Sequence, residues 1–353
     1  MYQNKKQIGF SLVELLVALV LGLVVSAAAI QIFASNKGTY RLENALSRLQ
    51  ENGRFVVDQM INDLRMAGYN GCLSRGAGVP VNDITPGAIA TSNAFVLFPY
   101  AIDGTDSIRG FNYGTSDWVP SLDASLNLSG VVANTDVINI QRASSCGAQL
   151  TSAPTSTGDT AIDVVDPNGC DFTANEVVMI TDCSVADVFQ IGSLTTGTDT
   201  VALNRAGGTL SAIYSQASQV FRWQSTAYFV GTDANGQPAL FRSSWTPDGD
   251  NDIQADDFTT LALASGIEDM QLLYGIDTGM DEYADAYVTA NNVTNWDAVR
   301  SIRIGLLLRS DNNITQEPRS IQFNGATVNP VATGDRRLRT VYTTTVSLRN
   351  NTP

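Results

Sequence analysis

The chain has 353 residues, 44% of them hydrophobic, which is enough for a sizeable core in one or two domains. Its formal net charge of −14 argues against nucleic acid as the main partner, because phosphate binding requires clustered Lys and Arg. Since the sequence contains no histidine, it lacks the commonest general base and the commonest zinc ligand, and we expect no enzyme and no cofactor.

The N-terminus combines a short positive segment with a long apolar one. Residues 1–9, MYQNKKQIG, are polar and positive, and the 25 residues from Phe10 to Ala34 carry a single charge, that of Glu14. About 20 apolar residues span a bilayer as a helix, and the positive leader predicts a cytoplasmic N-terminus. An ordinary secretory signal fits poorly, because its apolar region is shorter and carries no acid.

Glu14 is the unusual residue of this apolar run. A carboxylate buried at mid-bilayer costs about 2.5–3.5 kcal/mol, and somewhat less near the interface. An acid inside a membrane segment therefore indicates a functional contact with a charged partner.

The string GFSLVELLVAL, Gly9 to Leu19, resembles the prepilin processing motif of type IV pilins and of type II secretion pseudopilins. The resemblance implies that prepilin peptidase cuts between Gly9 and Phe10, that Phe10 is then N-methylated, and that Glu14 is the family's acid near the mature N-terminus. In a bundle of parallel helices, Glu14 of one subunit would neutralise the Phe10 amine of a neighbour and fix the axial register.

Residues 36–68 predict the amphipathic half of the same helix. The apolar positions at helical spacing are Leu42, Leu46, Leu49, Val56, Met60 and Leu64. One helix from Phe10 to Ala67 would be about 87 Å long, with residues 10–35 bare and the second half packed on a folded domain. Gly68 supplies the stop, and Gly22 is a weak point at which the helix could bend during assembly.

Residues 69–353 predict a β-rich domain of short strands and turns. The expected strands are Ala94–Tyr100, Asp136–Gln141, Glu176–Thr181, Asp187–Ile191, Gln219–Gly231, Ala239–Trp245, Glu268–Tyr274, Val299–Arg309 and Leu338–Leu348. Gly192–Thr200 and Asp277–Trp296 are interpreted as loops. The expected class is α+β, type IV pilin-like, with the long helix packed on antiparallel sheet, in two sheets.

Four cysteines, Cys72, Cys146, Cys170 and Cys183, follow the apolar segment. If that segment crosses an inner membrane, they lie in an oxidising compartment and pair. Three connectivities are open. We favour Cys72–Cys146 and Cys170–Cys183, which join neighbours in chain order, with buried free thiols as the alternative.

One acidic run raises the question of calcium. Asp248, Asp250 and Asp252 place oxygen ligands at alternate positions, which suits calcium. The EF-hand pattern fails, however, because Ile253 occupies the sharp-turn position and Thr259 stands where the bidentate Glu belongs. A solvated loop is the favoured interpretation, and we expect no metal.

Four later segments resemble PilW-type minor pilins, and the last of them also resembles GspJ-type pseudopilins. They are Val177–Leu194, Gly266–Gly275, Val299–Ser310 and Arg336–Asn350. The resemblance implies a subunit of the inner membrane and then of the pilus, which primes assembly at the tip. The implied partners are other minor pilins, the major pilin, prepilin peptidase, the inner-membrane assembly platform and a tip adhesin. The output would be piliation, twitching motility, adhesion or DNA uptake.

Two alternatives stay open. A type II secretion pseudopilin would carry the same N-terminal motif, and the genes next to this one would separate the two systems. A membrane-anchored periplasmic binding protein or enzyme would be indifferent to the identity of Glu14 and would keep its activity without residues 10–35.

Overall fold

The computed structural model describes residues 11–73, 81–84, 107–122, 128, 130–165, 170–245, 258–279 and 281–351. Gly9 and Phe10, the expected strand Ala94–Tyr100 and the aspartates Asp248, Asp250 and Asp252 lie outside these ranges.

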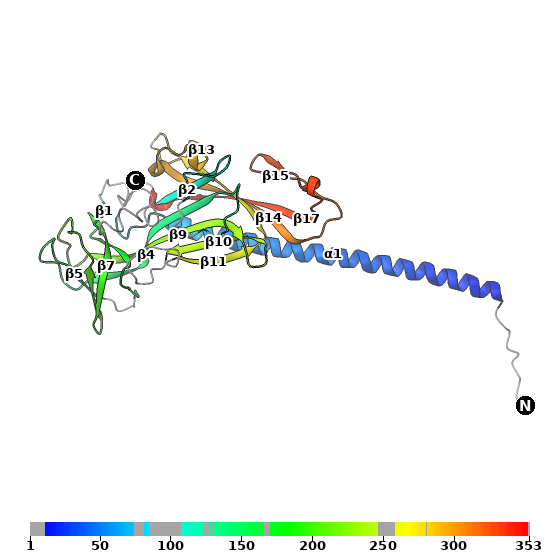
Figure 1. Ribbon diagram of the computed structural model, residues 1–353, viewed down its shortest axis with the longest axis horizontal. Coiled ribbons are helices and arrows are strands. Elements are labelled where there is room, and N and C mark those ends of the chain that lie inside the picture. Colours follow the sequence, from blue (N-terminus) through cyan, green and yellow to red (C-terminus); the bar gives the residue numbers. More distant parts are fainter. Residues whose placement is uncertain are drawn as a thin grey trace, which may run out of the picture.

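A single long helix, α1 (Leu12–Met66), carries the N-terminal part of the chain. It runs without a break through Gly22, and its first half projects from the folded domain (Figure 1). The helix ends where Gly68 takes a positive φ of 70°. The side-chain amide of Asn350 donates to the carbonyl oxygens of Arg65 and Ala67, at 3.3 and 3.2 Å, and so caps the last turn. One continuous helix, as the sequence predicts, is confirmed.

Most of the remaining chain forms one large sheet. Its strands, in chain order, are β1 (Val81–Asp83), β2 (Ile108–Tyr113), β3 (Trp118–Val119), β4 (Val137–Leu150), β5 (Ala161–Val165), β6 (Val177–Thr181), β7 (Ala186–Thr196), β8 (Thr200–Arg205), β9 (Gln219–Thr232), β10 (Pro238–Trp245) and β11 (Phe258–Ser265). The pairings are antiparallel except for β1, which joins β7 in parallel.

Six of these strands close on themselves. The order β9-β6-β7-β8-β5-β4 is completed by a further pairing of β4 with β9, so the ring has no free edge among its members. Alternate residues point inward and form a core of their own, which includes Ile162, Val178, Phe189 and Leu203. The ring lies at the end of the domain away from the free half of α1 (Figure 1).

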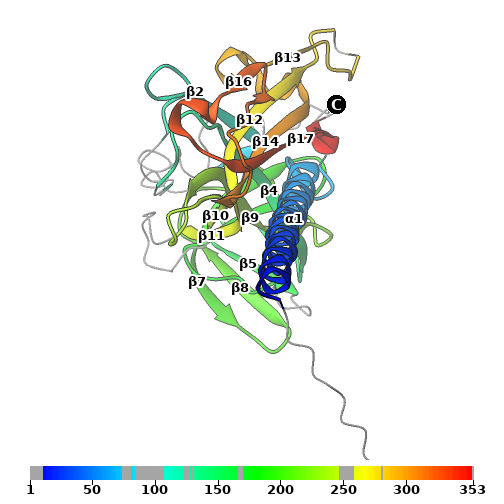
Figure 2. The ribbon, with the colours of Figure 1, turned by 90° about the vertical axis from the view of Figure 1, so that its right-hand side faces the viewer.

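A second sheet packs against α1. It has the order β13-β12-β14-β17, formed by β12 (Ile267–Ile276), β13 (Ala286–Val288), β14 (Val299–Asn313) and β17 (Arg337–Ser347), with a separate hairpin of β15 (Ile321–Phe323) and β16 (Ala326–Val328). Seen nearly end-on, α1 lies against β17 and beside β9–β11 (Figure 2). The α+β prediction is confirmed, with the small hairpin as a third sheet among the described residues.

The helix approaches this sheet closely at one glycine. A Cβ atom at Gly53 would lie 2.6 Å from the ring of Tyr342 on β17, so only glycine lets the helix and this ring meet. Around this contact Leu49, Val56 and Met60 share one core with Ile304 and its neighbours on β14.

One of the two loop expectations needs correction. Gly192–Thr200 is mostly strand, since β7 continues to Thr196 and pairs with β8 across a tight turn. These hairpin residues are mostly exposed on both faces, so they show no alternation of apolar and polar residues. Asp277–Trp296 is largely loop, as expected, but contains the short strand β13.

All four cysteines are paired, but the favoured connectivity is wrong. The bonds join Cys72 to Cys183 and Cys146 to Cys170. After α1 the chain turns at Gly71, whose α-carbon lies against Phe221 and Thr181. This brings Cys72 to the turn between β6 and β7, where Cys183 lies. Order along the chain was therefore a wrong guide to the pairing, because two cysteines form a disulfide only where they lie close together in space.

A buried carboxyl group joins the two sheets. Asp136 precedes β4 and accepts hydrogen bonds from the Leu272 amide of β12 at 2.7 Å and from the Asn112 side chain of β2 at 2.8 Å. Burial is the largest influence on its pKa and raises it from 3.8 to about 6, against the lowering effect of these hydrogen bonds. Burial raises the pKa of Asp269 on β12 to about 6 as well.

These two groups predict that the protein is less stable at neutral than at mildly acidic pH. A pKa that is higher in the folded chain stabilises it fully below pH 4, and this contribution is lost as the pH rises through 6. For Asp136 alone, about two pKa units correspond to about 3 kcal/mol. Denaturant unfolding of the full chain in detergent at pH 4, 5, 6 and 7 measures how the free energy of unfolding depends on pH. Asp136→Asn should reduce this dependence. A free energy of unfolding that rises from pH 4 to 7 contradicts this.

Candidate assembly surface

The first half of α1 is an apolar surface with no cover from its own chain. The exposed fraction of the side chains is 76% at Leu12 and still 72% at Phe33. In the described part of the chain this is the one helix long and apolar enough to cross a membrane, and its most apolar window is wholly unburied. Such a surface must be covered by lipid or by other proteins.

Glu14 lies on the first turn of this helix. Its carboxylate accepts a hydrogen bond from the Ser11 amide at 3.1 Å, while the Ser11 hydroxyl accepts one from the Val13 amide at 3.4 Å. Together they form a capping box, which satisfies amides that the first turn leaves without partners. The apolar run around Glu14 predicts only a partner on another subunit; this local partner was missed, although the pattern Ser-x-x-Glu could have revealed it.

Two family models match parts of the chain. Residues 227–350, from the middle of β9 to just beyond β17, match the family model described as Type IV Pilus-assembly protein W. Residues 4–30 match the prokaryotic N-terminal methylation motif. No curated protein matches the chain in sequence. Together these two matches support a type IV pilus minor pilin of the PilW type. The methylation motif and the single long apolar helix indicate membrane anchoring and a location related to the pilus.

One buried acid fixes α1 to the domain. Asp63 accepts a hydrogen bond from the Tyr228 hydroxyl at 2.5 Å and forms ion pairs with Arg242 at 3.2 Å and with Arg142 at 3.9 Å. The three partners come from β9, β10 and β4, so one helical residue reaches three neighbouring strands of the large sheet. This contact sets the rotation of α1, and with it the direction in which each side of the helix faces.

The described residues contain no group of three or more acidic or cysteine side chains placed to hold a metal. The weak calcium candidate at Asp248, Asp250 and Asp252 falls outside them. The matched family takes part in pilus assembly, which is a structural role. Such a role implies interaction with other pilus components.

Proposed function

We propose that the protein is processed between Gly9 and Phe10, methylated at Phe10, and built into a priming complex of minor pilins that starts the pilus fibre. The proposed parts are a leader (1–9), a membrane and filament-core segment (10–35), the amphipathic half of the helix (36–68) and a globular domain (69–353) that faces the periplasm before assembly. Its action is to be assembled and not to catalyse a reaction.

The observation that carries this proposal is the exposed apolar half of α1 with one acid on its first turn. The hydrocarbon of the membrane can cover the apolar residues, and so can the helices of neighbouring subunits. Neither medium solvates a carboxylate, so Glu14 favours the neighbour that brings a positive charge. Cleavage before Phe10 would create that charge as a free amine.

The capping box suggests how Glu14 acts in two stages. Before assembly its carboxylate satisfies the Ser11 amide of its own chain. During assembly the Phe10 amine of an adjacent subunit adds an ion pair to the same carboxylate, whose two oxygens can accept several hydrogen bonds. The acid then sets the axial register between subunits without leaving its own helix uncapped.

Mass spectrometry of protein from sheared surface filaments tests this function. The expected chain begins at Phe10 and carries one methyl group on its amine. Gly9→Leu should leave the heavier, unmethylated precursor in the membrane, whereas Glu14→Ala should be processed but assemble poorly. A mature protein that keeps its leader, or one that is absent from fractions holding other pilins, contradicts the proposal.

A minor pseudopilin of type II secretion is the second candidate, since the N-terminal motif serves both systems. The PilW match over residues 227–350 favours the pilus. The filaments with which the protein co-purifies separate the two. A membrane-anchored binding protein or enzyme would instead function with Glu14 replaced.

A further inference from the structure

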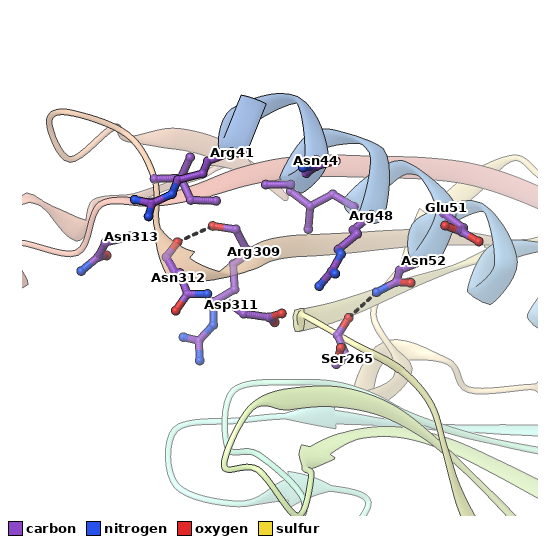
Figure 3. Close-up of a pocket in the computed structure, with 14 residues that line it drawn as sticks. Arg41, Asn44, Arg48, Glu51, Asn52, Ser265, Arg309, Asp311, Asn312 and Asn313 are labelled. Carbon is purple, nitrogen blue, oxygen red and sulfur yellow. Dashed lines mark hydrogen bonds between the residues drawn. The ribbon is translucent and has the colours of Figure 1, made fainter. Parts of the chain in front are cut away.

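A polar groove runs between α1 and the edge of the folded domain. It has a volume of about 810 Å³, and the charged and polar residues that line it on the helix include Arg41, Asn44, Arg48 and Glu51. The opposite wall holds Asp311 and Asn312 at the end of β14, with Ser265 of β11 hydrogen-bonded to Asn52 of α1 at 3.0 Å. The Arg48 side chain points into the space between these walls (Figure 3). The groove begins just after the apolar half of the helix ends.

Arg41 and Arg48 are exposed and have no hydrogen bond or ion pair among the described residues. The third arginine of the groove, Arg309, is bound to Glu268 at 3.3 Å. Asp311 forms no ion pair with either free guanidinium in the described structure. The helix wall therefore presents two free cations to any occupant.

The spacing of the two arginines decides whether a lipid or a protein is the occupant that can reach both of them. Seven residues separate them, or about 10 Å along one side of α1. Counted from Ala34, Arg41 lies about 10 Å and Arg48 about 21 Å beyond the apolar run, whereas the headgroup layer on each side of a bilayer is only about 5–7 Å thick. A phospholipid could reach Arg41 but not Arg48. A protein segment could reach both.

We propose that Arg41 and Arg48 bind two carboxylates, about 10 Å apart, on an adjacent pilin-like subunit. This rests on the proposed function, because the groove continues the surface of α1 that assembly would cover. Two acids two turns apart on one face of a helix match the spacing. Guanidinium groups suit this role because they bind carboxylates in bidentate fashion. The proposal adds a specificity contact between the folded parts of subunits to the axial contact made by Glu14.

The test places a photo-crosslinking amino acid at Asn44 in the full chain, expressed with its pilus system. The expected product joins this chain to a subunit that carries the N-terminal methylation motif, through a segment with two suitably spaced acids. The double variant Arg41→Glu, Arg48→Glu should lower the yield by at least about tenfold. Arg54→Glu is the matched control, since Arg54 is on the same helix, outside the groove, and forms an exposed pair with Asp58. It should leave the yield unchanged.

Arg41→Gln with Arg48→Gln is a milder variant, to be used with a thermal unfolding measurement to exclude misfolding, and it should also reduce the yield. Lysines in place of the two acids of the partner should restore crosslinking to the variant that carries both Arg41→Glu and Arg48→Glu. An undiminished crosslinking yield in both double variants overturns the proposal that the groove binds two carboxylates, as does crosslinking to phospholipid alone. If those variants are processed and co-purify normally with pilins, the proposed contact of the two arginines is refuted while the proposed function stands. An unprocessed wild-type chain contradicts the function itself.

Discussion

Asp63→Ala is expected to lower the free energy of unfolding by about 3–5 kcal/mol, because it removes one partner from a buried charge cluster. The acid is only 7% exposed, and Arg242, Arg142 and the Tyr228 hydroxyl all face it. Without it two guanidinium groups lie close together, partly shielded from water, with no counter-charge. Their desolvation is then no longer offset.

Denaturant unfolding of the full chain in detergent, followed by tryptophan fluorescence, measures this effect. Asp58→Ala is the matched control, since it is the same substitution five residues earlier on the same helix. Asp58 is exposed and its nearest contact with Arg54 is 3.8 Å, so its loss should cost less than about 1 kcal/mol. Equal effects at the two positions would show that Asp63 does not fix α1 to the sheet.

Removing the Cys72–Cys183 bond is expected to destabilise the protein by about 4–5 kcal/mol. The bond closes a loop of 111 residues in sequence separation, and a longer loop restricts the unfolded chain more. Cys146–Cys170 spans 24 residues, which predicts a smaller loss of about 3–4 kcal/mol. The first bond also ties the exit of α1 to the closed ring of strands.

The measurement compares two double variants, each with one pair of cysteines changed to serine, in unfolding experiments without reductant. Peptide mapping of the wild-type chain under non-reducing conditions should recover 72 joined to 183 and 146 joined to 170. A larger loss for the shorter loop would contradict the loop-entropy account. Recovery of a 72–146 peptide would contradict the connectivity itself.

The helix could be predicted because its signals are local. The apolar run after Phe10 and the stripe through Leu49, Val56 and Met60 depend only on residues a few positions apart, and helical hydrogen bonds join the same neighbours. Strands in which apolar and polar residues alternate clearly could be predicted equally well. Ile302, Ile304 and Leu306 on β14 are all fully buried, as their spacing predicts.

The candidate site was only partly accessible from the sequence. Glu14 stood out because a charge in an apolar run is rare, and this needs no structure to recognise. Arg41 and Arg48 looked like any solvated face of an amphipathic helix. Only the position of β14 and β11 beside α1 shows that they line a groove, and only the side-chain geometry shows that neither forms an ion pair with Glu51 or Asp311, the acids of the same groove.

The long helix, its membrane-like half, the acid on its first turn and the presence of a β-rich domain could all be predicted from local sequence patterns. The tertiary structure decided which strands close the ring, which cysteines meet, and where Asp63 docks. Periodicity records which face of an element is buried, but not what covers it. The partners of Asp63 lie up to 179 residues away in sequence, and such contacts are chosen by packing and charge in space, which no local pattern encodes.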